Sequence, residues 1–357
     1  MKIGLVRRGY SRTGGAEAYL RRFAETAAEA GHGIVLFTER WPEAEWPFEH
    51  VPIESDSPRS FAEAMDGQRA RDQCDFLFSL ERIFTCDCYR AGDGVHASWL
   101  ERRVKYEPFW RPWFRRFSRK HREMLALEKE LFGSRGARTV IANSGLIRDE
   151  IVKYFQYPAG KIQVIHNGVP PFTATAEDRA SRRHSLGLKE DDCAVLFAGS
   201  GWERKGLRFA VRAMNEAKLD GAKLLIAGRG NPHALPRCAQ ARFLGPVKDM
   251  APLLAAADVF ILPTIYDPFS NACLEALAAG LPVITTAQNG FSEIIESGVE
   301  GEIVKEPDDV IGLAMALKSW SDPERRKAAK PRLEVLGRRY TMAANVRETL
   351  AAIQGGR

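Results

Sequence analysis

The chain has 357 residues, a formal net charge of +6 and an apolar content of 45 %. This length suits two ordinary domains, and the composition is that of a globular protein. No apolar run reaches the roughly 20 residues of a membrane-spanning helix, and MKIGLV reads as a first strand rather than a secretory signal. The six cysteines show neither zinc-type spacing nor a compact disulfide framework, so we expect reduced thiols in a cytoplasmic protein.

The first predicted elements are a strand over 2–6, a polar loop that ends in Gly14 and Gly15, a helix over 16–30 and a strand over 33–38. This order opens a Rossmann-like unit. The loop is not GxGxxG, which argues against a dinucleotide. Gly15 can instead let a phosphate or a sugar approach the backbone at the helix N-terminus. The alternative is that the glycines only turn the chain.

The rest of the first half continues the alternation after an irregular, proline-rich stretch over 41–60. The further expected elements are helix 61–71, strands 75–80 and 86–91, helix 124–132, strand 138–142, helix 145–155 and strand 161–165. Asp93 and His96 follow the strand 86–91 in a glycine-flanked loop, the usual position for chemistry in an α/β fold. Each also has an ordinary interpretation, Asp93 as a turn residue and His96 as a packing residue.

Residues 99–122 form a basic aromatic segment, WLERRVKYEPFWRPWFRRFSRKHR. This composition favours a membrane surface, because aromatic rings enter the headgroup boundary and Lys and Arg meet anionic lipid. The expected membrane-facing residues are Trp110, Trp113, Arg115, Arg116, Arg119 and Lys120. Nucleic acid is the weaker alternative, since no nucleic-acid signature accompanies the segment. The other alternative is that the segment forms a pair of helices whose aromatic residues pack on their own domain.

The second half repeats the architecture, and the Gly-Val-Pro-Pro stretch near residue 168 marks the linker between the halves. The expected elements are strand 194–198, helix 207–217, strands 222–227 and 241–244, helix 250–256, strand 258–263, a helix from 270, strands 283–286 and 301–304, and helices 309–321, 324–336 and 340–354. We therefore expect an α/β fold with two doubly wound, Rossmann-like domains and a ligand in the cleft between them.

The stretch 263–286, PTIYDPFSNACLEALAAGLPVITT, carries two carboxylates. Asp267 precedes the N-terminus of the predicted helix and Glu275 follows about one and a half turns in, so both can face one ligand. The backbone N–H groups of Ser270, Asn271 and Ala272 suit a phosphate. The ordinary interpretation is that Asp267 caps the helix and Glu275 is solvated.

Cationic side chains follow other strands of the same half. Arg204 and Lys205 lie in a glycine-bounded loop and suit a diphosphate. Arg229 and the turn before Val247 follow the next two strands. A carboxylate such as Glu275 can accept hydrogen bonds from the two vicinal hydroxyls of a ribose. Together these groups match what a nucleotide-sugar presents.

At these residues the chain resembles the retaining glycosyltransferases of family four, which have the GT-B fold. The resemblance rests on Gly14-Gly15, IHNGV at 165–169, RKG at 204–206 and the stretch 267–286, and it covers essentially the whole chain. The last corresponds to the family's Glu-x7-Glu signature, with Asp267 in place of the first acid. The region 87–122 is most similar to the lipopolysaccharide core glucosyltransferases of this family.

The resemblance implies an acceptor domain over 1–168, a donor domain over 169–339 and a C-terminal helix over 340–357 that returns to the first domain. Arg204 and Lys205 then neutralise the diphosphate, assisted by Gly15 and the amides at 270–272. Glu275 holds the ribose, and Asp267 orients the transferred sugar. Arg229 and Val247 border the base, and Asp93 or His96 lies at the sugar on the acceptor side. No metal or other cofactor is expected.

The expected function is therefore retaining transfer of a hexose from a UDP-sugar to a lipid-linked saccharide in cell-envelope glycan synthesis. The enzyme is expected on the inner face of the cell membrane, as a peripheral protein without a nucleic-acid partner. Two alternatives share the fold and the donor. A nonhydrolysing sugar epimerase turns over UDP-sugar without an acceptor, and a silent nucleotide-binding protein binds the donor without transfer.

Overall fold

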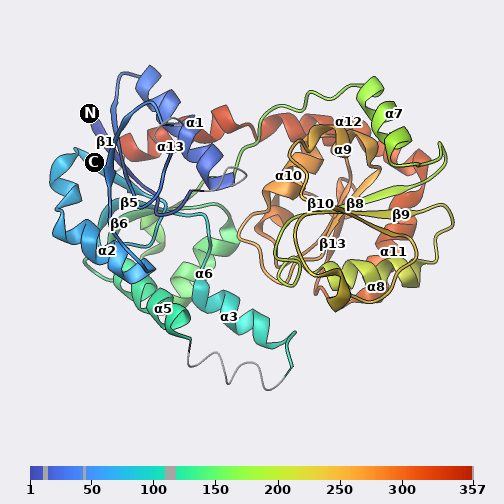
Figure 1. Ribbon diagram of the computed structural model, residues 1–357, viewed down its shortest axis with the longest axis horizontal. Coiled ribbons are helices and arrows are strands. Elements are labelled where there is room, and N and C mark those ends of the chain that lie inside the picture. The colour runs from blue at the N-terminus through green and yellow to red at the C-terminus, as the bar shows by residue number, and fades with distance from the viewer. Residues whose placement is uncertain (11–14, 43–45, 109–117, 356–357) are drawn as a thin grey trace. The chain divides into compact units, whose positions relative to one another are not determined.

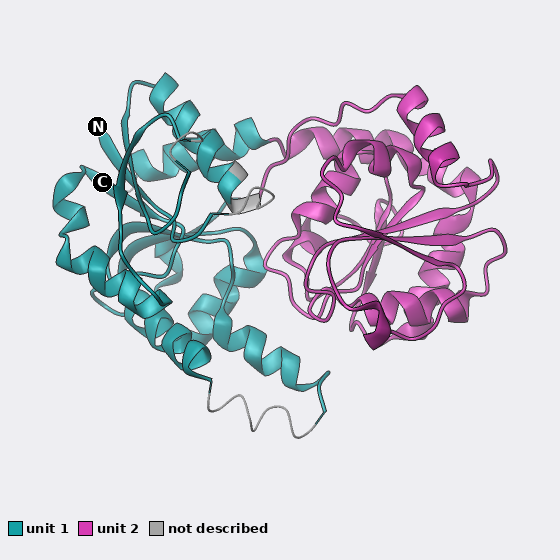
Figure 2. Cartoon of the chain, viewed as in Figure 1, with its two compact units in different colours: residues 1–166, 342–357 teal, residues 167–341 magenta. Residues whose placement is uncertain are grey.

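The computed structural model describes residues 1–10, 15–42, 46–108 and 118–355 and divides into two compact units (Figure 2). Unit 1 comprises residues 1–166 and 342–357, and unit 2 comprises residues 167–341. The boundaries expected from the sequence, after 168 and after 339, each differ from these by two residues. Each unit has a parallel β-sheet with helices on its faces (Figure 1).

Unit 1 contains a 7-stranded sheet in the order β3-β2-β1-β4-β5-β6-β7, with every strand pair parallel. Its strands are β1 (Lys2–Val6), β2 (Gly33–Thr38), β3 (Glu49–Pro52), β4 (Phe76–Ser79), β5 (Cys86–Ala91), β6 (Ala137–Ala142) and β7 (Ile162–Val164). Its α-helices are α1 (Gly15–Glu29), α2 (Pro58–Gly67), α3 (His96–Val104), α5 (Arg119–Leu131), α6 (Gly145–Phe155) and α13 (Met342–Gly355). Short 3₁₀ turns are η2 (Ala70–Gln73) and η3 (Ala159–Lys161).

Unit 2 contains a 6-stranded parallel sheet in the order β10-β9-β8-β11-β12-β13. Its strands are β8 (Ala194–Ala198), β9 (Lys223–Ala227), β10 (Ala241–Gly245), β11 (Val259–Leu262), β12 (Val283–Thr286) and β13 (Gly301–Val304). Its α-helices are α7 (Ala176–Ser185), α8 (Leu207–Ala217), α9 (Ala251–Ala256), α10 (Asn271–Ala278), α11 (Val310–Ser321) and α12 (Pro323–Arg339). The turns η4 (Pro232–Ala234) and η5 (Gly290–Ile294) complete it.

Each sheet has one place where the strand order reverses. In unit 1 the order runs outward from β1 to β3 on one side and from β4 to β7 on the other, so the reversal lies between β1 and β4. In unit 2 it lies between β8 and β11. Ligands of open parallel sheets bind outside the carboxyl ends of the strands at this switch point. The loops after β1, β4, β8 and β11 are therefore the first places to look for a site.

The last helix belongs to unit 1 because its apolar stripe completes that unit's core. Val346, Leu350 and Ile353 recur at helical spacing on α13 and are buried with Leu20 and Phe23 of α1. Tyr19 on α1 also donates a hydrogen bond to Thr349 (3.2 Å between the oxygens). Figure 1 shows α1 and α13 lying together against the sheet.

Most expected elements agree with the structure to within a few residues, but α3 was not among them, because His96 was expected in a loop. The stretch 41–60 contains the edge strand β3, and the helix expected over 61–71 begins earlier, at Pro58, where Ser57 forms a capping box, and ends at Gly67. The region before β8 contains α7, which the periodicity did not predict.

In the part of the chain that the structure describes, no helix is long and apolar enough to cross a membrane.

Candidate functional site

The switch point of unit 2 brings the predicted cations and the first predicted carboxylate together. Arg204 and Lys205 lie in the loop after β8, and Asp267 lies in the loop after the neighbouring strand β11. The Lys205 ammonium donates directly to Asp267 Oδ2, and the Arg204 guanidinium lies 3.6 Å from the same oxygen. Asp267 is 5 % exposed. The sequence thus predicted the three residues, and the structure joins them in one ion-paired cluster.

The electrostatics of this cluster leave an excess of positive charge. Burial by itself raises the pKa of Asp267, but Lys205 and Arg204 more than offset this, so the pKa lies below its ordinary value. The carboxylate is therefore ionised at neutral pH and balances one of the two cations. A diphosphate placed here would meet a net positive cluster whose cations are already held in position.

One glycine allows the loop after β8 to pack closely on the loop after β11. Gly206 adopts a left-handed conformation (φ +75°) at the start of α8, and a Cβ atom there would lie 1.8 Å from the carbonyl oxygen of Pro263. The loop after β8 can therefore pack directly on the loop after β11, with Ile265 N donating to the Arg204 carbonyl (2.9 Å). Any larger residue at 206 would separate Lys205 from Asp267.

The N-terminus of α10 presents open backbone donors beside this cluster. Ser270 is the N-cap, and its hydroxyl accepts from Cys273 N. Ser270 N itself donates to the Asn289 side chain, so it is not available to a ligand. Among the described residues, the N–H groups of Asn271 and Ala272 have no hydrogen-bond acceptor. Two of the three predicted amides are thus open to an anion at a helix N-terminus.

Glu275 lies on the same helix and is half-buried. Within the described part of the chain its carboxylate has no hydrogen bond and no ion pair. Burial raises its pKa, and no cation offsets that effect. A partly desolvated carboxylate without a protein donor is poorly stabilised, so it is suited to accept hydrogen bonds from ligand hydroxyls.

Two asparagines fix the loop that carries Asp267, and sequence reasoning assigned a role to neither. Asn289 is fully buried; its oxygen accepts from Ser270 N and Phe291 N, and its nitrogen donates to Thr285 and Cys273. Asn167 donates to Asn271 Oδ1 at 2.7 Å. Asn167 lay within the IHNGV motif, but nothing in the local pattern showed which residue its amide contacts 104 positions away.

The two residues that were predicted to border the nucleotide base lie on neighbouring loops. Arg229 is exposed after β9, and Val247 is half-buried after β10. Both follow carboxyl ends of strands on one side of β8, in the order β10-β9-β8. Their positions suit a ligand that extends from Lys205 across that edge of the sheet.

The switch point of unit 1 holds a second charged cluster. Arg7, directly after β1, pairs with Glu17 of α1 (3.1 Å) and with Glu81 after β4 (3.0 Å). Asp93, after β5, lies 3.9 Å from the same guanidinium and is 58 % exposed at its side chain. Burial raises the pKa of Glu81, although Arg7 opposes the effect. Asp93 is thus the most exposed acid of the cluster, and Gly15 is the first residue of α1.

His96 opens α3 rather than lying in a loop. Its Nε2 lies 3.0 Å from Nδ1 of His121 on α5. Desolvation, with smaller contributions from Arg82, His121 and Lys120, lowers its pKa to about 4. His96 is therefore a neutral imidazole at physiological pH.

Glu128 of α5 anchors this region and was not predicted. Its carboxylate is fully buried, accepts from His96 N (2.6 Å) and Ala97 N (3.2 Å), and pairs with Arg82 (3.0 Å). Arg82 in turn donates to the Gly94 carbonyl (2.7 Å). The glycine loop with Asp93 is thereby attached to α5 as well as to β5. A buried acid seven residues after His121 in a charged helix gives no distinctive signal in the sequence.

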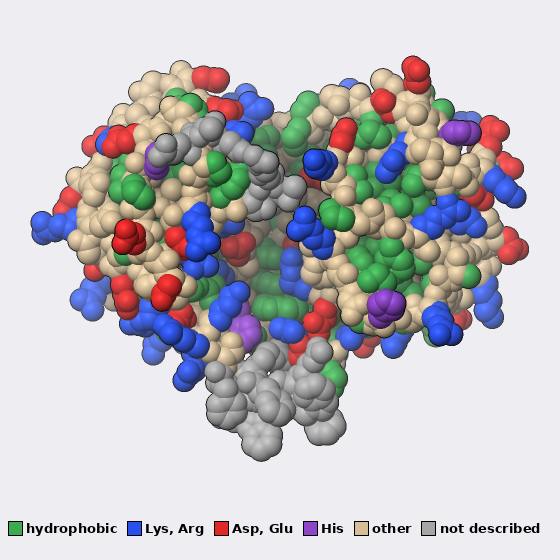
Figure 3. All heavy atoms as spheres, viewed as in Figure 1, with side chains coloured by type: hydrophobic (Ala, Val, Ile, Leu, Met, Phe, Trp, Pro, Cys, Tyr) green, Lys and Arg blue, Asp and Glu red, His purple; other side chains and the backbone are tan. Residues whose placement is uncertain are grey.

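Only part of the basic aromatic segment falls within the described residues. Trp110, Trp113, Arg115 and Arg116 lie outside them. Arg119 and Lys120 are exposed in the first turn of α5, and Arg119 pairs with Glu123 (2.6 Å). On the face seen in Figure 3, basic and acidic side chains are interspersed over both units.

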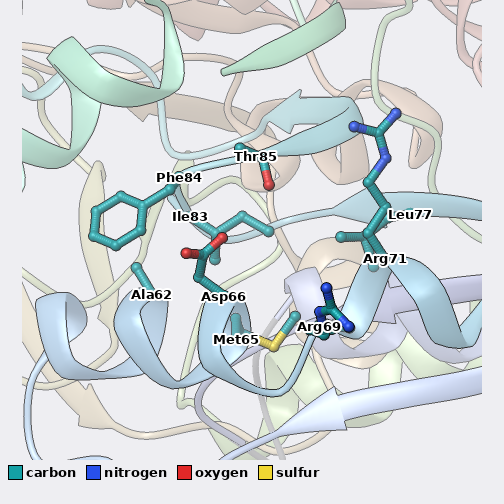
Figure 4. A pocket seen from close by; sticks show the side chains of 10 residues that line it. Ala62, Met65, Asp66, Arg69, Arg71, Leu77, Ile83, Phe84 and Thr85 are labelled. Carbon is teal, nitrogen blue, oxygen red and sulfur yellow. The ribbon is translucent and has the colours of Figure 1, made fainter. Parts of the chain in front are cut away.

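A small crevice lies elsewhere in unit 1. Its walls include Met65 and Ile83, and Arg69, Arg71 and Asp66 lie around it (Figure 4). Arg71 also pairs with Asp87 at the amino end of β5, which is the opposite edge of the sheet from Asp93. None of the predicted site residues lines this crevice.

Comparison with known proteins agrees with this geometry. The family described as "Glycosyl transferases group 1" matches residues 192–322, which carry the Lys205–Asp267 cluster. The "Glycosyltransferase Family 4" family matches residues 89–171, which include Asp93 and His96. The two parallel α/β units have the GT-B fold. In the two matched regions the chain is similar to glycosyltransferases of the group 1 and family 4 type.

Individual relatives agree with this class. The chain is 34 % identical to the uncharacterized glycosyltransferase MJ1607 of Methanocaldococcus jannaschii, over 51 % of this chain and 51 % of the relative, so the match spans about half the length of that protein. It is 25 % identical to lipopolysaccharide glucosyltransferase WaaG of Escherichia coli K12, over 82 % of each protein.

Two solved structures share the fold. A WaaG structure, described as a glycosyltransferase involved in lipopolysaccharide biosynthesis, superposes with a TM-score of 0.82 at 21 % identity and covers 99 % of this chain and 100 % of its own. HepE of Anabaena, in complex with UDP and glucose, superposes with a TM-score of 0.76 at 16 % identity and 99 % coverage of both chains.

Proposed function

We propose that the protein is a retaining, metal-independent glycosyltransferase that moves a hexose from a UDP-sugar to a lipid-linked saccharide. The observation that carries this proposal is the cluster at the switch point of unit 2. Lys205 and Arg204 are held there beside Asp267, and α10 adds its open N–H groups and Glu275, whose carboxylate has no hydrogen bond or ion pair among the described residues. These groups supply cations, amide donors and a carboxylate in the arrangement that a nucleoside diphosphate sugar requires.

In the proposed reaction Lys205 and Arg204 stabilise the charge that develops on the departing diphosphate. The N–H groups of Asn271 and Ala272 bind the same oxygens. Two side-chain cations thus provide the charge that a metal ion would supply in other transferases. In the presence of a donor, the diphosphate competes with Asp267 for Lys205, which leaves the Asp267 carboxylate able to accept from sugar hydroxyls.

The remaining assignments concern the two ends of the donor. Glu275 accepts from the ribose hydroxyls, and Arg229 and the backbone at Val247 border the base. The bond between the anomeric carbon and the diphosphate oxygen breaks as the acceptor oxygen bonds to the same face of the sugar. The departing phosphate oxygen takes the acceptor proton, so no carboxylate nucleophile is needed. At the other end, Asp93, or His96 in its place, is the residue that we propose for the sugar on the acceptor side.

The identity of the donor and acceptor rests on the relatives and on surface chemistry. HepE has been solved with UDP and glucose, and WaaG is named a lipopolysaccharide glucosyltransferase, which supports UDP-glucose or a similar donor and a cell-envelope acceptor. Val104 on α3 and Leu125 on α5 are among the exposed large apolar residues, at 48 % and 37 %, and α5 also carries the exposed cations Arg119 and Lys120. Apolar and basic groups together suit an anionic lipid surface, so we place the protein peripherally on the inner face of the cell membrane.

The test is transfer of labelled sugar from UDP-glucose and UDP-N-acetylglucosamine to a lipid–saccharide extract, with and without EDTA. We expect label in the lipid fraction at the same rate in both cases, and a product whose anomeric configuration, read by NMR, matches that of the donor. Turnover of the donor without acceptor would instead indicate an epimerase. Donor binding with neither transfer nor turnover would indicate a silent binding protein, and inverted configuration or loss of activity in EDTA would refute the mechanism.

A further inference from the structure

The first residue of unit 2, Asn167, reaches the N-terminus of α10. Its Nδ2 donates to Asn271 Oδ1 at 2.7 Å and to the carbonyl of Phe269 at 3.4 Å. Phe269 and Asn271 flank Ser270, the N-cap of the helix. The amide of Asn167 therefore spans the turn that leads into α10, on the residue where the chain enters the unit.

The backbone on both sides of Asn167 is fixed. The carbonyl of His166 accepts from the Asn345 side chain. Val169 N donates to the Tyr340 carbonyl (3.1 Å), and Val169 forms a bridge with Thr341. Because Val169 is held within unit 2, the segment that carries Asn167 is attached to that unit two residues further along the chain as well as at α10.

This contact determines the orientation of the Asn271 amide. An asparagine amide carries an acceptor oxygen on one arm and two N–H donors on the other. Since Oδ1 of Asn271 is held by Asn167, its Nδ2 is turned the other way. Among the described residues, neither this Nδ2 nor the backbone N–H of Asn271 has an acceptor. The side chain thus adds donors to the end of the helix, where the helix dipole already favours an anion.

We propose that Asn167 is a positioning residue for the donor diphosphate. It holds the Asn271 oxygen away from the anion, so that Asn271 binds the diphosphate through its side-chain nitrogen as well as its backbone N–H. The inference rests on the proposed function, because it deepens the account of the same nucleotide site.

The alternative orientation explains why such a residue is needed. Without Asn167, the Asn271 amide can rotate and present its oxygen to the phosphate, which is repulsive. An aspartate at position 167 would go further, because its carboxylate accepts from Asn271 Nδ2 and so favours the wrong orientation. It also adds a negative charge near the anion. Asn167→Asp is nearly isosteric, so it tests orientation with little change in packing.

The experiment measures the affinity of the full-length protein for UDP by titration calorimetry. The variants are Asn167→Ala, Asn271→Ala, the double variant and Asn167→Asp. We expect each single alanine variant to bind about tenfold more weakly, which corresponds to the loss of one hydrogen bond to a charged group. The double variant should bind no more weakly than Asn271→Ala alone, and Asn167→Asp should bind more weakly than Asn167→Ala.

Asn215→Ala is the matched control, because Asn215 lies late in α8 and donates to the Arg237 carbonyl on the protein surface. It should bind UDP as the wild type does. Additive losses in the double variant, unchanged affinity of Asn167→Ala, or tighter binding by Asn167→Asp than by Asn167→Ala would each overturn the positioning role. Failure of the wild type to bind UDP, ADP or GDP would overturn the proposed function together with this inference, whereas wild-type binding with an additive cycle overturns the inference alone.

Discussion

Lys205 and Asp267 show what sequence reasoning can and cannot give at the scale of single residues. Each was predicted as a ligand residue from its place after a strand. Their direct ion pair could not be predicted, because it joins residues 62 positions apart and depends on Gly206 packing on the Pro263 carbonyl. The pair also changes the interpretation of Asp267, which holds the cations in place before a ligand arrives.

Replacing Lys205 with alanine should reduce sugar transfer by on the order of a hundredfold or more, because the departing diphosphate loses the ammonium group that we propose stabilises its charge. Transfer rates with UDP-glucose measure the effect, and circular dichroism verifies that the protein is folded. Lys330→Ala is the control, since Lys330 is exposed on α12, outside the cluster. A wild-type rate for Lys205→Ala would remove the cluster from the mechanism.

His96 gives a prediction for pH. In the unfolded chain its imidazole takes up a proton near the ordinary pKa of about 6.5, whereas in the folded protein burial keeps the pKa at about 4. Between these values the unfolded state binds more protons, so stability falls as pH falls from 6.5 toward 4. We expect the difference in Tm between the wild type and His96→Gln, in favour of the wild type at pH 7, to shrink by pH 5. A difference that is independent of pH contradicts the shifted pKa.

At the scale of elements, the periodicity of apolar residues predicted most strands and helices but not α7. The inner face of α7 has arginines where an amphipathic helix has leucines. Arg183 is 8 % exposed and pairs with the buried Asp258, and Arg179 donates to the same carboxylate. The helix is attached to unit 2 by buried ion pairs, which the apolar pattern cannot reveal. The signal that was present is the capping box of Thr175 and Asp178.

Helix α3 is a second element that the sequence did not predict. It begins at His96 because Glu128 accepts hydrogen bonds from the N–H groups of His96 and Ala97 in its first turn. Removing this carboxylate by Glu128→Ala would leave Arg82 and the N–H groups of His96 and Ala97 buried without their acceptor. We expect a loss of about 3–5 kcal/mol in the free energy of unfolding of unit 1, measured by denaturant titration. Glu123→Ala on the same helix removes only a pair with the exposed Arg119 and should cost roughly 1 kcal/mol or less. Equal costs for the two variants would refute the anchoring role.

At the scale of the whole molecule, the sequence predicted two Rossmann-like units and a C-terminal helix, and the structure has two parallel sheets with α13 in unit 1. The strand order was not predictable, because local patterns do not say which strands are neighbours. The strand order determines which loops meet at the candidate site. It makes β8 and β11 adjacent and so brings their loops together, and it does the same for β1 and β4.

The membrane proposal also belongs to this scale. Replacing Arg115, Arg116, Arg119 and Lys120 with glutamate should abolish sedimentation with anionic liposomes, because each cation near such a surface contributes about 1 kcal/mol. Glutamates at Arg325, Lys327, Lys330 and Arg338 of α12 give a control of equal charge change in unit 2, which should still sediment. Unchanged binding of the first variant would exclude this segment as the membrane contact.

The central claim is that the switch point of unit 2 binds a nucleotide-sugar donor. Calorimetric titration of UDP-glucose into the wild type and Glu275→Ala is the sharpest test, because the Glu275 carboxylate has no hydrogen bond or ion pair to any described residue that the substitution would break. We expect the wild type to bind and Glu275→Ala to bind at least about tenfold more weakly, with its Tm in the absence of ligand no lower than that of the wild type. Equal affinities of the two proteins would contradict it.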